Sequence, residues 1–136
     1  MIIDKELEMD AANTVTASEA SVSHIDQGAA GDALGGKELT LVVRCATTAD
    51  SATDAATVTV SLQTDDNSSF NSAKTLFTSG AFAIASAELT ANGILCKVKL
   101  PVGAERYLRV YYTVANENLT AGKFDAFLVP STDVGL

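Results

Sequence analysis

The chain has 136 residues, of which 47% are hydrophobic and 19% are charged. This composition excludes a disordered chain and predicts one packed domain, residues 1–136, large enough to bury a core without disulfides or metals. The net charge of −8 excludes free nucleic acid as a direct partner, because proteins that bind phosphates carry an excess of lysine and arginine.

The charges are unevenly distributed along the chain. Residues 1–38 hold eight acidic residues against two lysines, whereas residues 97–123 hold five basic residues against two glutamates. This asymmetry indicates electrostatic steering between surfaces, either within an oligomer or onto a partner. The alternative is ordinary surface charge that keeps an acidic protein soluble.

The first residues suggest neither export nor a membrane anchor. They become acidic at once, with no apolar signal region, and no run approaches the roughly 18 apolar residues of a membrane span. We therefore expect no membrane partner and a protein made in a reducing cytoplasm. Residues 1–20 are expected to form an extended N-terminal arm, with a single helical turn near Asp4–Ala12 as an alternative. The glycines of Gly28–Gly36 lack the spacing of a phosphate-binding loop and predict a flexible connection.

Alternation of apolar and polar residues dominates the chain after residue 37, which is typical of half-buried antiparallel strands. The clearest strands are Glu38–Ala46, Thr57–Thr64, Ile94–Leu100 and Arg106–Val114. Shorter candidates are Ser21–Ile25, Ala73–Thr78, Phe82–Ala85 and Lys123–Val129. Turn signals between them include Thr47–Ala56, Asp65–Ser69 and Asn116–Gly122. About eight short strands predict an all-β antiparallel sandwich, jelly-roll-like or immunoglobulin-like.

The most polar run, VSLQTDDNSSF at residues 60–70, resembles a calcium-binding loop at first sight. Counted from Asp65, however, it has Phe70 in place of the central glycine and Leu76 in place of the twelfth-position glutamate. A turn explains it better, with Leu62 and Phe70 closing the core on either side. We therefore expect that exchanging Asp65 and Asp66 for asparagine together leaves folding unchanged.

Residues for catalysis are scarce. His24 is the only histidine, so a Ser-His-Asp triad or a histidine-rich metal site would have to include it; its setting favours a surface or hydrogen-bonded structural role. Cys45 and Cys96 alternate toward the core, where thiols are inert, and their spacing leaves open whether they pair. The sequence predicts no enzyme, no cofactor and no metal site.

One strand predicts a protein interface. If Arg106–Val114 points its aliphatic residues inward, then Tyr107, Arg109 and Tyr111 point outward, and Phe127 points outward on Lys123–Val129. Tyrosine, arginine and phenylalanine are enriched at interfaces. The predicted interface residues, with two outward lysines added, are Tyr107, Arg109, Tyr111, Phe127, Lys97 and Lys99. Alternatively, the N-terminal arm or a second sheet covers them.

Four segments in a fixed order carry a resemblance that runs nearly from end to end. They are IDQG at Ile25–Gly28, VSLQTDDNSSF at 60–70, ERYLRV at Glu105–Val110 and TAGK at Thr120–Lys123. With them the chain resembles the small capsid cement (decoration) proteins of short-tailed phages of the Bordetella-phage type. The acidic Asp4–Asp10 and the segment 47–56 depart from that pattern.

The resemblance implies a jelly roll that assembles as a homodimer on the outer capsid surface of the virion. There it would clamp neighbouring major capsid subunits against internal DNA pressure. Two alternatives belong to other classes: a glycan- or receptor-binding sandwich on a virion or tail, and a small hydrolase with His24 as its base. The lack of tryptophan is unfavourable for the glycan-binding alternative.

Overall fold

The computed structural model describes residues 7–26, 39–101 and 103–130, and these ranges are built from strands. A short 3-10 helix, η2, precedes β8, and no helix in the described ranges is long and apolar enough to cross a membrane. The elements are β1 (Glu8–Thr14), β2 (Glu19–Ala20), β3 (Ile25–Asp26), β4 (Leu39–Ser51), β5 (Thr57–Asp65), β6 (Lys74–Thr78), β7 (Phe82–Ala83), η2 (Ala87–Leu89), β8 (Ile94–Lys99), β9 (Tyr107–Ala115) and β10 (Leu119–Pro130).

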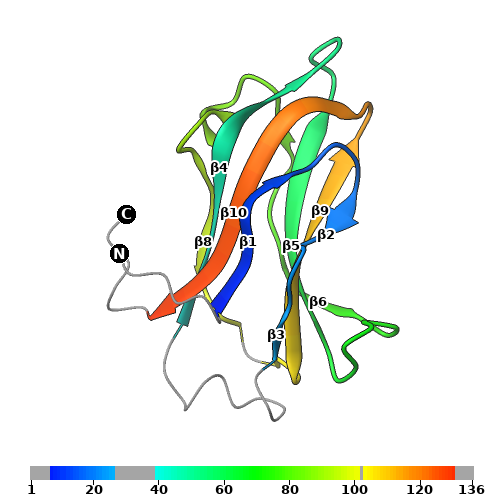
Figure 1. The fold of residues 1–136 in the computed structure, drawn as a ribbon, viewed down its shortest axis with the longest axis vertical. Coiled ribbons are helices and arrows are strands. Elements are labelled where there is room, and N and C mark those ends of the chain that lie inside the picture. The colour runs from blue at the N-terminus through cyan, green and yellow to red at the C-terminus, as the bar shows by residue number, and fades with distance from the viewer. Residues whose placement is uncertain (1–6, 27–38, 102, 131–136) are drawn as a thin grey trace.

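The strands form two antiparallel sheets that pack as a sandwich (Figure 1). One sheet has four strands, in the order β1-β10-β4-β8. The other has six strands along the path β2-β9-β5-β6, with β3 also paired to β9 and β7 also paired to β5. The dark-blue β1 lies beside the orange β10, so the beginning and the end of the described chain are neighbours in one sheet (Figure 1). The predicted antiparallel sandwich is confirmed.

The connections between the strands are those of a jelly roll. β2 and β3 pair with successive parts of one edge of β9, and β6 and β7 do the same on β5, so each pair fills one strand position. Each sheet then has four positions, and the chain changes sheet at every step except from β5 to β6. Eight positions connected in this way make the double-sheet jelly roll, which confirms the predicted topology.

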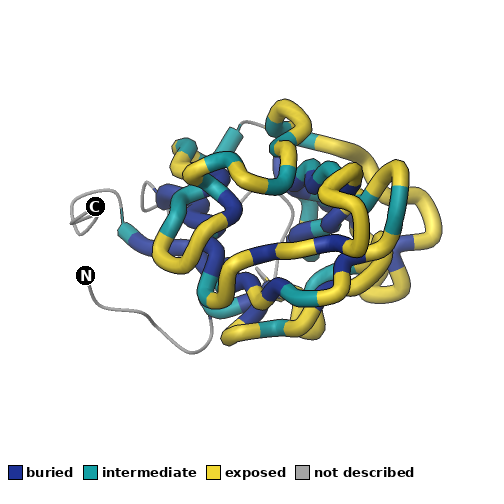
Figure 2. Tube along the Cα trace, turned by 90° about the horizontal axis from the view of Figure 1, so that it is seen from above, coloured by how far each residue is buried: buried dark blue, intermediate teal, exposed yellow. Residues whose placement is uncertain are grey.

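The core lies between the sheets and takes up the inward side of each alternating strand. On β5, Val58, Val60 and Leu62 are completely buried, while the residues between them are half-buried. β9 repeats the pattern around Leu108 and Val110. Exposed residues are concentrated in the segments that join the strands. Seen from above, buried and exposed stretches alternate along the chain (Figure 2). Burial of one side of every strand is the main contribution to folding of such a sandwich.

Within the expected N-terminal arm, residues 1–20, Glu8–Thr14 is extended as expected and is a strand of the four-stranded sheet, while residues 1–6 lie outside the described residues. The alternative of a helical turn is wrong for Glu8–Ala12, which pairs with β10. Met9 and Val15 are completely buried in the core. β1 is bulged: its pairing register shifts on both sides of Asp10, and Ala12 has a φ of +49°. Bulges break the two-residue period, so the sequence pattern does not reveal the strand.

Other boundaries also differ from the sequence-based expectation. β4 continues to Ser51 and β10 begins at Leu119, so much of the expected turns Thr47–Ala56 and Asn116–Gly122 is strand. Register shifts in this part of the β4–β10 pairing again interrupt the alternation. The expected strand Ser21–Ile25 is in a strand only at its last residue. The glycine-rich connection expected at residues 28–36 lies outside the described residues.

A buried hydrogen bond links the two sheets beside β1. The Tyr112 hydroxyl of β9 donates to Asp10 Oδ2 at 2.7 Å, and the Val22 N–H donates to Asp10 Oδ1 at 2.8 Å. Burial raises the pKa of Asp10 above its ordinary value, although these two hydrogen bonds oppose the shift. Burial and the nearby Asp10 charge raise the pKa of Tyr112, so its hydroxyl remains a donor at neutral pH.

Removal of this hydrogen bond measures its contribution to the free energy of unfolding. Asp10→Ala leaves the Tyr112 hydroxyl buried without an acceptor, and we expect the free energy of unfolding to fall by about 2–4 kcal/mol. Tyr112→Phe removes only the donor and serves as the control, with an expected loss of about 1–2 kcal/mol. Urea unfolding at pH 7 measures both variants. Asp10→Ala as stable as the wild type would show that the link contributes nothing to the fold.

Candidate functional site

Tyr107, Arg109 and Tyr111 lie on the outer face of the six-stranded sheet, as the alternation of β9 predicts. All three are half-buried, while the two residues between them are completely buried. The residues opposite them on β5 are polar, namely Asp65, Gln63 and Ser61. The central strands of the sheet therefore place two tyrosines and an arginine together on one outer face.

Arg109 is held on three sides. Its Nε donates to Gln63 Oε1 at 2.8 Å. Its guanidinium carbon lies 4.4 Å from the ring centre of Phe70 and 5.7 Å from that of Tyr111. Cation–π contacts at exposed sites contribute about 0.5–1 kcal/mol each. The guanidinium is therefore held in one orientation by this protein's own side chains.

Two further rings extend this surface. The His24 ring lies 5.3 Å from the Tyr107 ring and 6.0 Å from the Phe70 ring, and Phe70 lies 6.5 Å from Tyr107, all in edge-to-face contact. His24 precedes β3 and Phe70 follows β5, so segments far apart in sequence meet here. We name the six residues the β9 patch: His24, Gln63, Phe70, Tyr107, Arg109 and Tyr111.

Phe70 is not where the sequence-based expectation placed it. Leu62 is in the core as expected, but Phe70 is absent from the core cluster and is buried on the outer face instead. Phe70 has a φ of +53°, which is uncommon for a bulky residue, and its N–H donates to Asn67 O at 3.0 Å. This reversal of the chain sends the ring to the outer side of the sheet, which the sequence pattern did not reveal.

Asp65 organises the turn that carries Phe70. Its Oδ1 accepts the N–H groups of Asp66 at 2.7 Å and Asn67 at 3.3 Å, and its Oδ2 accepts the Ser72 N–H at 2.8 Å. The hydrogen bond from Ser72 is the main cause that lowers the pKa of Asp65. The polar run is thus the predicted turn, and its first carboxylate is a structural acceptor.

One group of carboxylates in the described ranges has the spacing of a cation site. Ligand oxygens of Asp65, Asp66 and Glu105 lie within 4.8 Å of one another. The sequence did not reveal Glu105 as a member, because it lies far from Asp65 along the chain and only the fold brings the two together. Lys74 Nζ lies 2.7 Å from Glu105 Oε1, and backbone N–H groups occupy the oxygens of Asp65. Because the protein's own donors bind oxygens of Asp65 and Glu105, we assign no metal to the group.

The other predicted interface residues lie on the opposite face of the sandwich. Phe127 stands opposite Val42, which in turn stands opposite Lys97, and Lys99 lies two residues further along β8. Lys97 and Lys99 are exposed. Phe127 is completely buried in a second apolar cluster with Val42 and Val129. The six predicted residues therefore belong to two faces rather than to one stripe.

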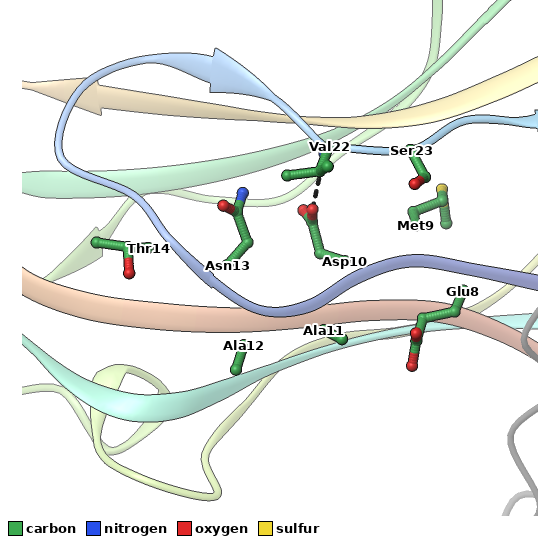
Figure 3. Close-up of a pocket in the computed structure, with 9 residues that line it drawn as sticks. All are labelled: Glu8, Met9, Asp10, Ala11, Ala12, Asn13, Thr14, Val22 and Ser23. Carbon is green, nitrogen blue, oxygen red and sulfur yellow. Dashed lines mark hydrogen bonds between the residues drawn. The ribbon is translucent and has the colours of Figure 1, made fainter.

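A cavity of about 490 Å³ lies between β1 and the chain that joins β2 to β3 (Figure 3). Asp10 points across it toward Val22, where the dashed line marks their hydrogen bond (Figure 3). The described lining residues are Glu8, Met9, Asp10, Ala11, Ala12, Asn13, Thr14, Val22 and Ser23. They include no histidine, cysteine or lysine.

The three residues considered for catalysis are placed as structural residues. Cys45 and Cys96 are buried in the core as free thiols and form no disulfide. Burial raises the pKa of Cys45 and raises that of Cys96 to about 12, so both stay protonated at neutral pH. Because the thiolate is the nucleophile, neither thiol is activated. His24 is exposed and packs edge-on against aromatic rings.

Comparison with known families decides the identity of this sandwich. Residues 9–128 match the family described as Bbp16. The chain belongs to the Bbp16 family. This is a family of Bordetella phage capsid cement proteins, which are structural proteins and not enzymes. Membership implies the role of a phage capsid cement protein, with binding to a capsid and a place in the virion. No curated protein matches the chain.

The structure changes the expectation for the two adjacent carboxylates of this cement protein. Asp65→Asn puts an amide where an oxygen accepts backbone N–H groups, so we expect the melting temperature at pH 7 to fall by roughly 5 °C. Asp66→Asn is the matched control and leaves it unchanged, because the Asp66 side chain is exposed and the group that donates to Asp65 is the Asp66 backbone N–H, which the substitution keeps. Equal melting temperatures for the two variants would contradict this assignment.

Acid titration gives a second measurement on the same pair. The pKa of Asp65 is lowered in the folded state, so its contribution to stability is complete above the ordinary value of 3.8 and is lost as the pH falls below it. We expect Asp65→Asn to reduce the loss of stability in this range, as measured by urea unfolding between pH 5 and pH 2.5.

Proposed function

We propose that the protein binds the outside of a phage capsid as a homodimer and stabilises the shell by bridging neighbouring major capsid subunits. Membership of the cement family supports a capsid-binding role. The β9 patch is the observation that carries the finer proposal. It presents Tyr107, Arg109 and Tyr111 on a paired, rigid sheet, and these residue types dominate the energetics of protein interfaces.

A protein that bridges subunits needs more than one contact surface, and the sandwich offers two different outer faces. The six-stranded sheet carries the β9 patch. The four-stranded sheet carries Lys97 and Lys99 on β8, an edge strand of its sheet. Lysines on an edge strand discourage pairing with a further strand. We therefore assign Lys97 and Lys99 to charge contacts and not to extension of the sheet.

A cement protein needs a rigid structure and does not need catalytic residues. Repeated copies on a shell bind with avidity, so each contact needs only modest affinity. Bridged subunits resist separation only if the bridge does not itself deform. A jelly roll with a continuous buried core meets this requirement without a cofactor or an active site.

Two measurements test the proposal. Light scattering of the purified protein is expected to give the mass of a dimer. Co-sedimentation with expanded capsids that lack this protein is expected to show saturable binding and a higher temperature of capsid disruption. Serum albumin serves as the non-binding control. A strict monomer that stays in the supernatant would overturn the proposal, and saturable binding on a glycan array would then favour a glycan-binding module.

A further inference from the structure

Arg109 differs from the other two arginines of the chain in its partner. Arg44 Nε lies 2.9 Å from Asp125 Oδ2, and Arg106 Nε lies 2.9 Å from Asp26 Oδ1. Arg109 Nε instead donates to the neutral amide of Gln63. Within the described ranges no carboxylate pairs with Arg109, so its positive charge is not neutralised by a neighbour.

The surroundings of Arg109 prepare it to bind an acceptor. Phe70 and Tyr111 hold the guanidinium, and Gln63 takes up Nε, which leaves the two Nη amino groups as its remaining donors. Those two groups form a planar fork that matches the two oxygens of a carboxylate. A side chain fixed in advance loses little conformational entropy on binding, so more of the contact energy appears as affinity.

We propose that Arg109 binds a carboxylate side chain of the major capsid protein, so that the β9 patch is the face of the cement protein that meets the shell. This inference rests on the function proposed above and adds the surface and the chemistry of the contact. The net charge of −8 is unfavourable for a phosphate-rich partner, whereas a single carboxylate needs only this one local cation.

Charge also argues against a second copy of this chain on the same patch. A two-fold contact places identical patches against each other, so the patch would have to supply its own carboxylates. Of the carboxylates beside it, backbone N–H groups hold Asp65, Arg106 holds Asp26 and Lys74 holds Glu105, and the exposed Asp66 follows Asp65 in the turn outside the patch. A two-fold contact centred on the patch would also place Arg109 against Arg109, which is repulsive. A different protein with a free carboxylate fits the patch better.

The test measures affinity for expanded capsids that lack this protein, using Arg109→Ala, Arg109→Lys and the matched control Arg106→Ala. Arg106 lies just before the same strand, and its exposed ion pair contributes little to stability. Its guanidinium lies 5.1 Å from the centre of the Tyr107 ring, so the control removes equal charge from the edge of the patch and leaves Arg109 in place. We expect Arg109→Ala and Arg109→Lys to weaken binding at least tenfold and Arg106→Ala to change it less than threefold. Melting temperature and light scattering are expected to show folded dimers for all three variants.

A second arm tests the carboxylate itself. Amidation of capsid carboxylates with a carbodiimide and methylamine is expected to weaken binding of the wild type and to leave binding of Arg109→Ala nearly unchanged. Capsid binding by Arg109→Ala equal to that of Arg106→Ala would overturn this inference alone. Dissociation of Arg109→Ala into monomers would also overturn it, because the patch would then face a second copy. A wild type that does not bind would overturn the proposed function as well.

Discussion

The buried hydrogen bond between Asp10 and Tyr112 is the contact on which the arrangement of this sandwich depends. It ties β1, the first described strand of the four-stranded sheet, to β9 in the other sheet. Both groups are removed from water, and an unpaired partner in this place would cost more free energy than the bond contributes. The bond therefore requires β1 to lie against the core.

β9 also carries the candidate site, on its outward side. Tyr112 points inward to Asp10, while its neighbour Tyr111 points outward beside Arg109. The side chains of a strand alternate between its faces. Core packing that fixes the inward residues of β9 therefore also fixes the position and direction of the outward ones. Core packing thus provides the rigid support that a binding surface needs, and no separate device is required.

The turn after β5 makes the second contribution to the surface. Asp65 accepts three backbone N–H groups, and the chain reverses so that Phe70 covers one side of Arg109. The run that suggests a calcium loop in the sequence is therefore the scaffold of an aromatic contact. Its polar residues hydrogen-bond the backbone of the turn, and the turn positions Phe70 against the guanidinium of Arg109.

The sequence by itself determined the all-β class, most of the strands and the outward direction of Tyr107, Arg109 and Tyr111. These follow from the two-residue period, which depends only on local backbone geometry. Tertiary structure alone decided that β1 joins a sheet, because its bulges remove that period. It also decided that Phe70 meets both Arg109 and His24, and that Phe127 lies on the outer side of the other sheet and is buried there. Such contacts between distant segments depend on how the two sheets fold together, and no local pattern encodes them.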